Sequence, residues 1–413
     1  MPKFLQKHLP VTTLIKKINN GEKIDELMGK ANKLLDHSVV IHVVTNDLDN
    51  AYQLFEVLND RGKDLAIGDY LRSSSLELIS SNDTAVDRVS EIWDEILSED
   101  LADKFLKDYL SSYKGKLKKS NVHKQFRQEF WSDSKDQRVS NVVTRVENIN
   151  KMRKIHTSLL KAEWPFKSSN AVKSWHRLRL EKLLIELRHK HCIPLLLMLY
   201  ENVDDLTFYN TIDVLEKFIF RYMRIGGSRA NRITKIYNST IKNVRNGEQF
   251  DLDKFKQGLK NLLIKHSSDD IFEVKLKELE YNTSNISTIR YLLTMLSYYK
   301  NSYDSGDRDS DLKPDISIIH NVDSGDIEHI YANSHNYDGK LNENRNKIGN
   351  LTFWATSDNR SQKEAKFNVK KVVYINSPVN ITKSIAEYSQ WTIDEFKYRN
   401  NYLIDMSKEI FKL

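Results

Sequence analysis

Residues 326–331 read Asp-Ile-Glu-His-Ile-Tyr, and residues 348–354 read Ile-Gly-Asn-Leu-Thr-Phe-Trp. Both runs are short and rich in β-branched and aromatic side chains, a composition that favours strands over helices. We expect the first run to form a strand and the second run to return beside it as a hairpin. This pattern predicts a small α+β domain, which we place at residues 313–413.

Two further elements are expected around the hairpin. Residues 316–320 read Ile-Ser-Ile-Ile-His and predict another short strand, with a turn at residues 323–325 before the hairpin. After the hairpin, Ser357 is a favourable N-cap residue for a helix that runs through Ala365.

The chain upstream of this domain has a different pattern. From Thr84 to about Lys300, nearly every segment repeats its apolar residues with a period near 3.6, which is typical of amphipathic helices. We therefore predict a mainly α protein with a helical middle domain at residues 84–312. Its aromatic residues are expected to form a core and not to bind bases. They are Trp93, Phe130, Trp131, Trp175, Phe218, Phe220 and Tyr222.

The composition limits the fold and the compartment. The 413 residues include only 13 glycines and 6 prolines, which argues against Gly-rich α/β enzymes, propellers and β-sandwiches. The single cysteine, Cys192, permits neither an internal disulfide nor a thiolate zinc cluster, so we expect a cytoplasmic protein. No apolar run is long enough to span a bilayer, and we expect no membrane association. The net charge of +7 permits a polyanionic partner without establishing one.

Four polar residues around the hairpin form the most informative constellation: Glu328, His329, Asn350 and Asn359. A strand, its hairpin return and a following helix can bring these side chains together. Hydrolysis of a phosphodiester needs a base for water, a group that orients the base, and oxygen ligands for a divalent cation. Basic residues outnumber acidic ones between Lys340 and Lys371, which suits a phosphate backbone. The candidate phosphate contacts are Lys366, Lys370 and Lys371.

The runs at residues 326–330 and 348–352, together with Asn359, resemble the HNH (ββα-metal) nucleases. The particular resemblance is to the C-terminal nuclease domain of the GmrSD-type, modification-dependent restriction endonucleases. It implies that His329 is the general base and Asn350 its orienting partner, and that Glu328 and Asn359 contact the metal. It also implies that Lys370 contacts phosphate. Mg²⁺ is the expected ion, with Mn²⁺ as a substitute, because the ligands are hard oxygen atoms.

A second resemblance lies upstream, at residues 51–65 and Asp69. This run is similar to the end of the family's N-terminal, ParB-like nucleotide-hydrolysing module. The Asp-Gly-Gln-Gln-Arg motif on which that module's nucleotide chemistry depends occurs nowhere in the sequence. We therefore expect residues 1–83 to be a truncated remnant of the module, with a strand at residues 39–44. A partner subunit is expected to carry the missing nucleotide-binding half, and no cofactor other than the metal is expected.

These observations predict a metal-dependent DNA endonuclease that acts on double-stranded, foreign or modified DNA in a restriction or phage-defence system. A different class stays open: a non-catalytic nucleic-acid-binding or regulatory remnant of such a system. An NTPase is disfavoured by the absent motif. The run His189-Lys190-His191-Cys192 is not expected to bind zinc, because no second pair of ligands follows at a suitable spacing.

Overall fold

The computed structural model describes residues 67–118, 122–131, 138–167, 171–306, 312–318, 325–336, 338–354 and 364–413. The chain divides into two compact units, Met1–Leu65 and Ala66–Leu413. The first unit lies outside the described residues, and so do the strand predicted at residues 39–44 and the motif at residues 51–65. The described residues therefore all belong to the second unit.

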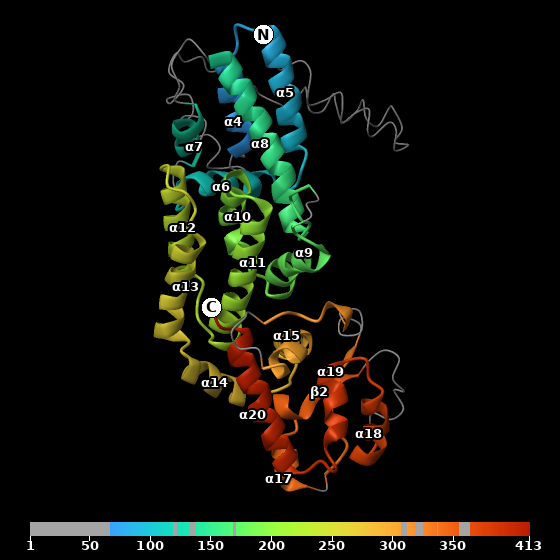
Figure 1. Ribbon diagram of the computed structural model, residues 1–413. Helices are drawn as coiled ribbons and strands as arrows, with labels where there is room; N and C mark the ends of the chain where they lie inside the picture. The colour runs from blue at the N-terminus through green and yellow to red at the C-terminus, as the bar shows by residue number, and fades with distance from the viewer. Residues whose placement is uncertain are drawn as a thin grey trace, which may run out of the picture. The chain divides into compact units, whose positions relative to one another are not determined.

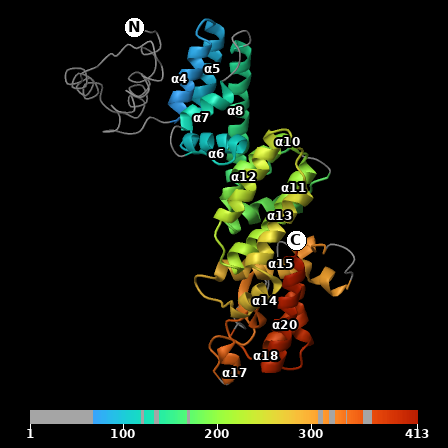
Figure 2. The same ribbon diagram turned by 90° about the vertical axis from the view of Figure 1, so that its left-hand side faces the viewer.

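The second unit is mainly helical, as the sequence predicts (Figures 1 and 2). Several helices begin at side chains that cap free backbone amides, for example Asn82, Asp204 and Asp251. The α-helices up to residue 304 are α4 (Ile67–Leu78), α5 (Asp83–Leu97), α6 (Ala102–Lys114), α7 (Val122–Phe130), α8 (Arg138–Leu160), α9 (Ser174–Glu181), α10 (Ile193–Asn202), α11 (Asp205–Ile219), α12 (Asn231–Arg245), α13 (Leu252–His266), α14 (Asp269–Glu278) and α15 (Ile286–Asp304).

The aromatic side chains of these helices are buried, which confirms that they belong to the core. Trp93, Phe218, Phe220 and Tyr222 are completely inaccessible, and Trp175 is nearly so. Phe130 and Trp131 are also buried. No helix of the described residues is long and apolar enough to cross a membrane.

The region after residue 312 contains a two-stranded antiparallel sheet. Strand β1 (Asp326–His329) pairs with β2 (Leu351–Trp354), so that Asp326 lies opposite Trp354 and His329 opposite Leu351. The predicted hairpin return is therefore confirmed. The helices around it are α17 (Gly339–Glu343), a 3₁₀ turn (Ile348–Asn350), α18 (Phe367–Ile375), α19 (Asn380–Lys383) and α20 (Ile393–Ile410). Tyr331, Trp354, Tyr374 and Trp391 belong to the core beneath the sheet.

Two elements differ from the prediction. Ile316–Ile318 forms a 3₁₀ helix and not a strand, because the Asp315 carboxylate accepts hydrogen bonds from the Ser317 amide (3.0 Å) and hydroxyl (2.6 Å) and turns the backbone. Ser357 lies outside the described residues, and Ala365 is not helical, since α18 begins only at Phe367.

The predicted boundaries near residues 83 and 312 do not separate compact units. Ala66–Leu413 is one unit, because α20 packs against α14 and α15 and carries the chain back to the helical body. Just beyond α20, the ring of Phe411 lies 4.3 Å from that of Phe220, measured between centroids. The C-terminal end thus shares a core with the middle helices.

Candidate active site

His329 ends strand β1 and is 8% exposed. Its Nε2 lies 3.1 Å from the side-chain oxygen of Asn346. Because an amide oxygen only accepts hydrogen bonds, Nε2 donates and carries the ring proton in this arrangement. The other nitrogen, Nδ1, therefore retains the lone pair that can accept a proton.

The segment that follows α14 contacts both His329 and Asn346. The ring of Tyr281 meets the imidazole edge-on, with centroids 5.2 Å apart and planes at 88°. The Tyr281 amide donates to the Asn346 carbonyl at 2.8 Å. Next to it, Glu280 pairs with Lys347 in an isolated β-bridge and through an ion pair of 2.9 Å.

The surroundings of His329 favour its neutral form. Burial lowers its pKa below the ordinary value of 6.5, and the positive charges of Lys370 and Arg345 lower it further. The hydrogen bond with Asn346 acts in the opposite direction. A neutral imidazole is the form that can act as a general base.

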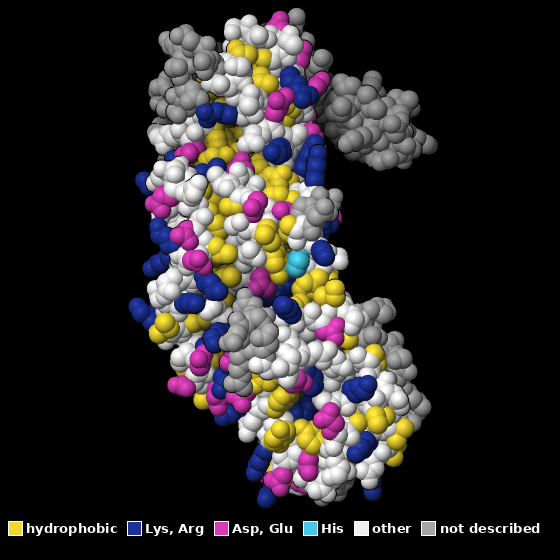
Figure 3. Space-filling model, viewed as in Figure 1, with side chains coloured by type: hydrophobic (Ala, Val, Ile, Leu, Met, Phe, Trp, Pro, Cys, Tyr) yellow, Lys and Arg dark blue, Asp and Glu magenta, His cyan; other side chains and the backbone are white. Residues whose placement is uncertain are grey.

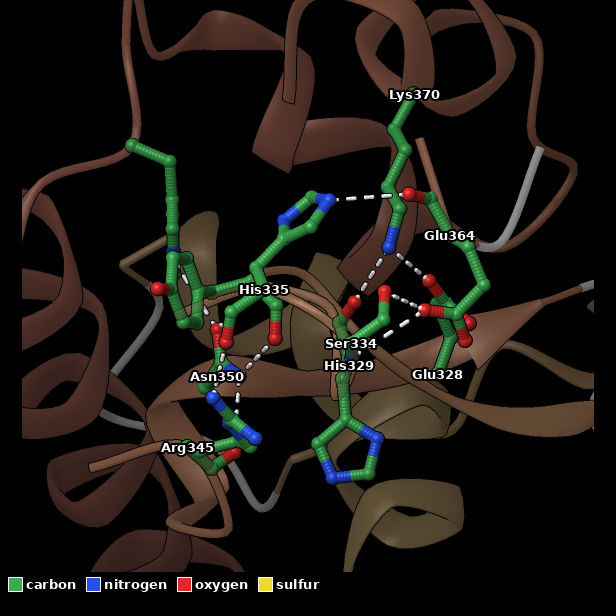
Figure 4. A network of polar contacts seen from close by, with 10 residues as sticks. Glu328, His329, Ser334, His335, Arg345, Asn350, Glu364 and Lys370 are labelled. Carbon is green, nitrogen blue, oxygen red and sulfur yellow. Dashed lines mark hydrogen bonds and ion pairs between the residues drawn. The ribbon is translucent and has the colours of Figure 1, made fainter. Parts of the chain in front are cut away.

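The side chain of Glu328, the residue before His329, points toward Lys370 and not toward the imidazole. Its carboxylate lies 2.5 Å from the ammonium of Lys370, and both side chains are buried. Lys370 also donates to the His329 carbonyl at 2.7 Å. Figure 4 shows the imidazole pointing away from this pair, as expected because successive side chains of a strand point to opposite faces.

The burial of Lys370 corrects its predicted role as a phosphate contact. Its side chain is completely inaccessible and is bound to Glu328, so it fixes α18 against β1 and does not present a charge to DNA. Lys371 donates to the Tyr388 carbonyl at 2.7 Å and is half-buried. Lys366, immediately before α18, is exposed and is available to a phosphate.

Asn350 lies beside β1 as predicted, but it does not orient His329. Its side-chain oxygen accepts from the Tyr331 amide at 2.8 Å and the Trp391 indole at 3.1 Å. Its nitrogen donates to the carbonyls of Tyr331 (3.1 Å) and Arg345 (2.8 Å). The buried amide is thus fully used in joining three segments of backbone and core. The predicted metal ligand Asn359 lies outside the described residues.

The close approach of α20 explains the glycine before Asn350. A Cβ at Gly349 would lie 2.6 Å from the Cβ of Asn400 and 2.8 Å from the Phe396 ring. Asn400 accepts from the Gly349 amide at 3.0 Å, and the buried Arg399 donates to the carbonyls of Gly349 (2.7 Å) and Leu351 (2.9 Å). Helix α20 therefore fixes the start of β2.

Sequence reasoning missed several residues of the site, Asn346 above all. Arg345 clasps the loop after β1 by donating to the carbonyls of Asn333 (2.5 Å) and His335. Across that loop, Ser334 donates to the Glu364 carboxylate, and His335 Nε2 lies 3.0 Å from the Glu364 carbonyl oxygen. The only signal in the sequence is the polar run at residues 342–346, which has no regular spacing to His329.

Metal-binding chemistry is limited in the part of the chain that the structure describes. There, no three His, Cys, Asp or Glu side chains gather as a group that could hold a metal ion. His189, part of the run that we expected not to bind zinc, is buried and bonded to the Tyr237 hydroxyl at 2.9 Å. The Cys192 thiol donates to the His189 carbonyl at 3.0 Å.

The comparisons with known proteins concern the C-terminal third of the chain. Residues 266–406 match the family of GmrSD restriction endonucleases, C-terminal domain. The match begins at the end of α13, so the family's domain includes α14, α15 and the segment that covers His329. A comparison with curated proteins finds no match. Residues 266–406 are therefore similar to the C-terminal domain of the GmrSD restriction endonucleases.

Proposed function

We propose that the protein is a metal-dependent DNA endonuclease of the HNH type with His329 as its general base. The observation that carries the proposal is the position of His329 at the end of β1, with Nε2 donating to Asn346 and Nδ1 left as a proton acceptor. A buried imidazole of lowered pKa in a hairpin of a nuclease family's domain is suited to activating water.

In the proposed reaction, Nδ1 of His329 accepts a proton from a water molecule. The oxygen of that water forms a bond to phosphorus while one P–O bond of the DNA backbone breaks. The leaving oxygen gains a proton from solvent, and the His329 imidazolium returns its proton to solvent, so the products are a phosphomonoester and an alcohol. Asn346 keeps the ring in one orientation and one tautomer throughout.

The donor chemistry of the site suits Mg²⁺ or Mn²⁺, since Glu328 provides a carboxylate and Asn359 provides an amide oxygen. These two residues would hold the ion, which when bound would polarise the phosphate and stabilise the leaving oxygen. The Glu328 carboxylate is paired with Lys370 and points away from the imidazole. A rotamer change of Glu328 or His329 therefore accompanies substrate binding in this proposal.

Exposed positive charge that could contact DNA lies near the hairpin. On the face shown in Figure 3, Lys and Arg side chains are interspersed with Asp and Glu. Lys340 and Lys366 are exposed near the hairpin, and they are the candidates for phosphate contacts. Because phosphate contacts position the protein without reading bases, we propose binding that depends on salt and little on sequence.

The experiment is nicking of supercoiled plasmid by the purified chain, with Mg²⁺, with Mn²⁺ and with EDTA. Cleavage that requires the ion supports the endonuclease. DNA binding without cleavage under all conditions supports the other class, a non-catalytic nucleic-acid-binding or regulatory remnant. The cytoplasmic location, the defence role and a partner subunit with a nucleotide-binding half remain parts of the proposal. The partner is tested by copurification with proteins encoded beside this chain.

A further inference from the structure

A cavity of about 720 Å³ lies in the helical body, outside the proposed active site. Helices α6, α10 and α12 pack pairwise (Figures 1 and 2). Residues of these helices and of the segment at residues 188–191 line the cavity. Gly115 allows the close approach of α6 and α12, because a Cβ there would lie 2.7 Å from the Asn238 carbonyl oxygen. The volume is within the usual range for small-molecule sites.

The rim of the cavity carries uncompensated positive charge. Lys116, Arg188 and Lys190 line it and are exposed, and the structure gives none of them an ion pair with a described residue. The one lining carboxylate, Asp108, is already bound to Lys104 at 2.6 Å and to His156 at 3.0 Å. A ligand with negative charge would therefore meet three cations, Lys116, Arg188 and Lys190, that form no ion pair within the part of the chain that the structure describes.

Arg188 has a positive φ of 52°, a backbone conformation that residues other than glycine rarely adopt. A π-helical segment, Lys182–Glu186, ends two residues before Arg188, with a hydrogen bond from the Leu187 amide to the Lys182 carbonyl. Irregularities of both kinds often occur at functional sites. Close to it is a second arginine, Arg224, whose pKa is lowered by burial and then by the charge of Arg188. Arg188 and Arg224 thus bring two like charges near each other.

The cavity also has an accessible apolar lining. Leu117, Ile185 and Pro194 line it and are exposed or half-buried. At its side, the Asn238 amide has no hydrogen bond to a described side chain or backbone group and is free to bind a ligand. A flat, largely apolar group fits against such a floor, with phosphate oxygens at the cationic rim.

We propose that this cavity binds a nucleoside phosphate, with the phosphate on Arg188, Lys190 and Lys116 and the base against Ile185 and Pro194. The chemistry is the same for a free nucleotide and for one unit of a DNA strand. The site is separate from His329, so it does not depend on the proposed nuclease reaction.

The test measures binding by the full chain in EDTA, where cleavage does not interfere. The probes are a fluorescein-labelled DNA duplex, followed by anisotropy at several salt concentrations, and GTP and inorganic pyrophosphate, followed by calorimetry. The variant is Arg188→Asn with Lys190→Ala, since asparagine tolerates positive φ and should preserve the turn. The matched control is Arg232→Ala with Lys235→Ala, two exposed cations of α12 that do not line the cavity.

If the cavity binds a nucleotide unit of DNA, the cavity variant should bind the duplex at least tenfold more weakly than the control. The dependence of the logarithm of its affinity on the logarithm of salt concentration should also be shallower, by about 0.9 per lost contact. If the source is a free nucleotide, GTP and pyrophosphate binding should be lost while the duplex is bound as by the control. The proposal is overturned if the cavity variant and the control bind every probe alike, or if the wild-type chain binds none of them.

Discussion

The ammonium of Lys370 lies 2.5 Å from the carboxylate of Glu328, and neither side chain is more than 6% exposed. The same ammonium donates to the carbonyl of His329, the next residue along β1. Helix α18 is therefore joined to the strand end at the residue that carries the proposed base. The buried pair fixes the backbone from which the imidazole projects.

Removing one partner of this pair should be costly. Lys370→Met leaves the Glu328 carboxylate buried without its counter-charge, which typically costs about 3–5 kcal/mol of unfolding free energy. Urea denaturation measures this loss. The exposed Lys366 offers the control, because Lys366→Met should change stability by less than about 0.5 kcal/mol. The double variant Glu328→Met with Lys370→Met should recover most of the loss, and equal stability of both single lysine variants would contradict the pair's role.

The two asparagines should separate orientation from stability. Asn346→Ala removes the partner of His329 Nε2, so nicking should slow by roughly tenfold or more while unfolding is little changed. Asn350→Ala leaves buried groups of Tyr331, Arg345 and Trp391 unpaired, which should cost about 1–3 kcal/mol of stability. Plasmid nicking and urea denaturation are measured on both variants. A silent Asn346→Ala beside a stable but inactive Asn350→Ala would return the orienting role to Asn350.

Tyr281 should control access to the imidazole. Its ring meets the His329 imidazole edge-on, and His329 is only 8% exposed. Because removing the ring exposes the imidazole, Tyr281→Ala should increase the rate at which diethylpyrocarbonate modifies His329 by roughly fivefold. Peptide mass mapping measures the modification. Tyr398, which is 69% exposed on α20, provides the control variant Tyr398→Ala. Equal rates in both variants would show that Tyr281 does not shield the ring.

His189 should make stability depend on pH. Burial lowers its pKa from 6.5 to about 3, so the folded state holds it neutral while the unfolded state binds a proton below pH 6.5. Its contribution to stability is complete above pH 6.5 and is lost progressively as the pH falls towards 3, by at most about 1.4 kcal/mol per pH unit. Urea denaturation at several pH values should show a shallower decline in His189→Gln than in the control His266→Gln, at a half-buried histidine away from His189. Parallel curves would contradict the assignment.

The sequence predicted the parts of the fold that follow from local pattern. Apolar periodicity identified the helical body, and β-branched composition identified the strand that ends at His329. The 3₁₀ helix at Ile316–Ile318 was missed, because a single side-chain cap from Asp315 overrides the strand propensity of its isoleucines.

Within the candidate site, the resemblance led to the correct hairpin but not to every contact. Asn346 binds His329 only because the segment at Glu280 and Tyr281 folds back over the hairpin, and this long-range packing has no periodic signature. The burial of Lys370 was likewise invisible, since a strand residue 42 positions away, Glu328, supplies its partner. A lysine near a phosphate-binding motif is read from sequence as exposed unless the packing is known.

The most direct measurement is plasmid nicking by His329→Ala in Mg²⁺, with DNA binding and urea denaturation measured on the same preparation. A general base at this position predicts that nicking falls by roughly 100-fold or more while binding and stability stay near those of the parent chain. His335→Ala, a change to the neighbouring histidine of the loop, should retain activity within a few-fold. A folded His329→Ala variant that nicks plasmid at the parental rate would contradict the assignment of His329 as the base.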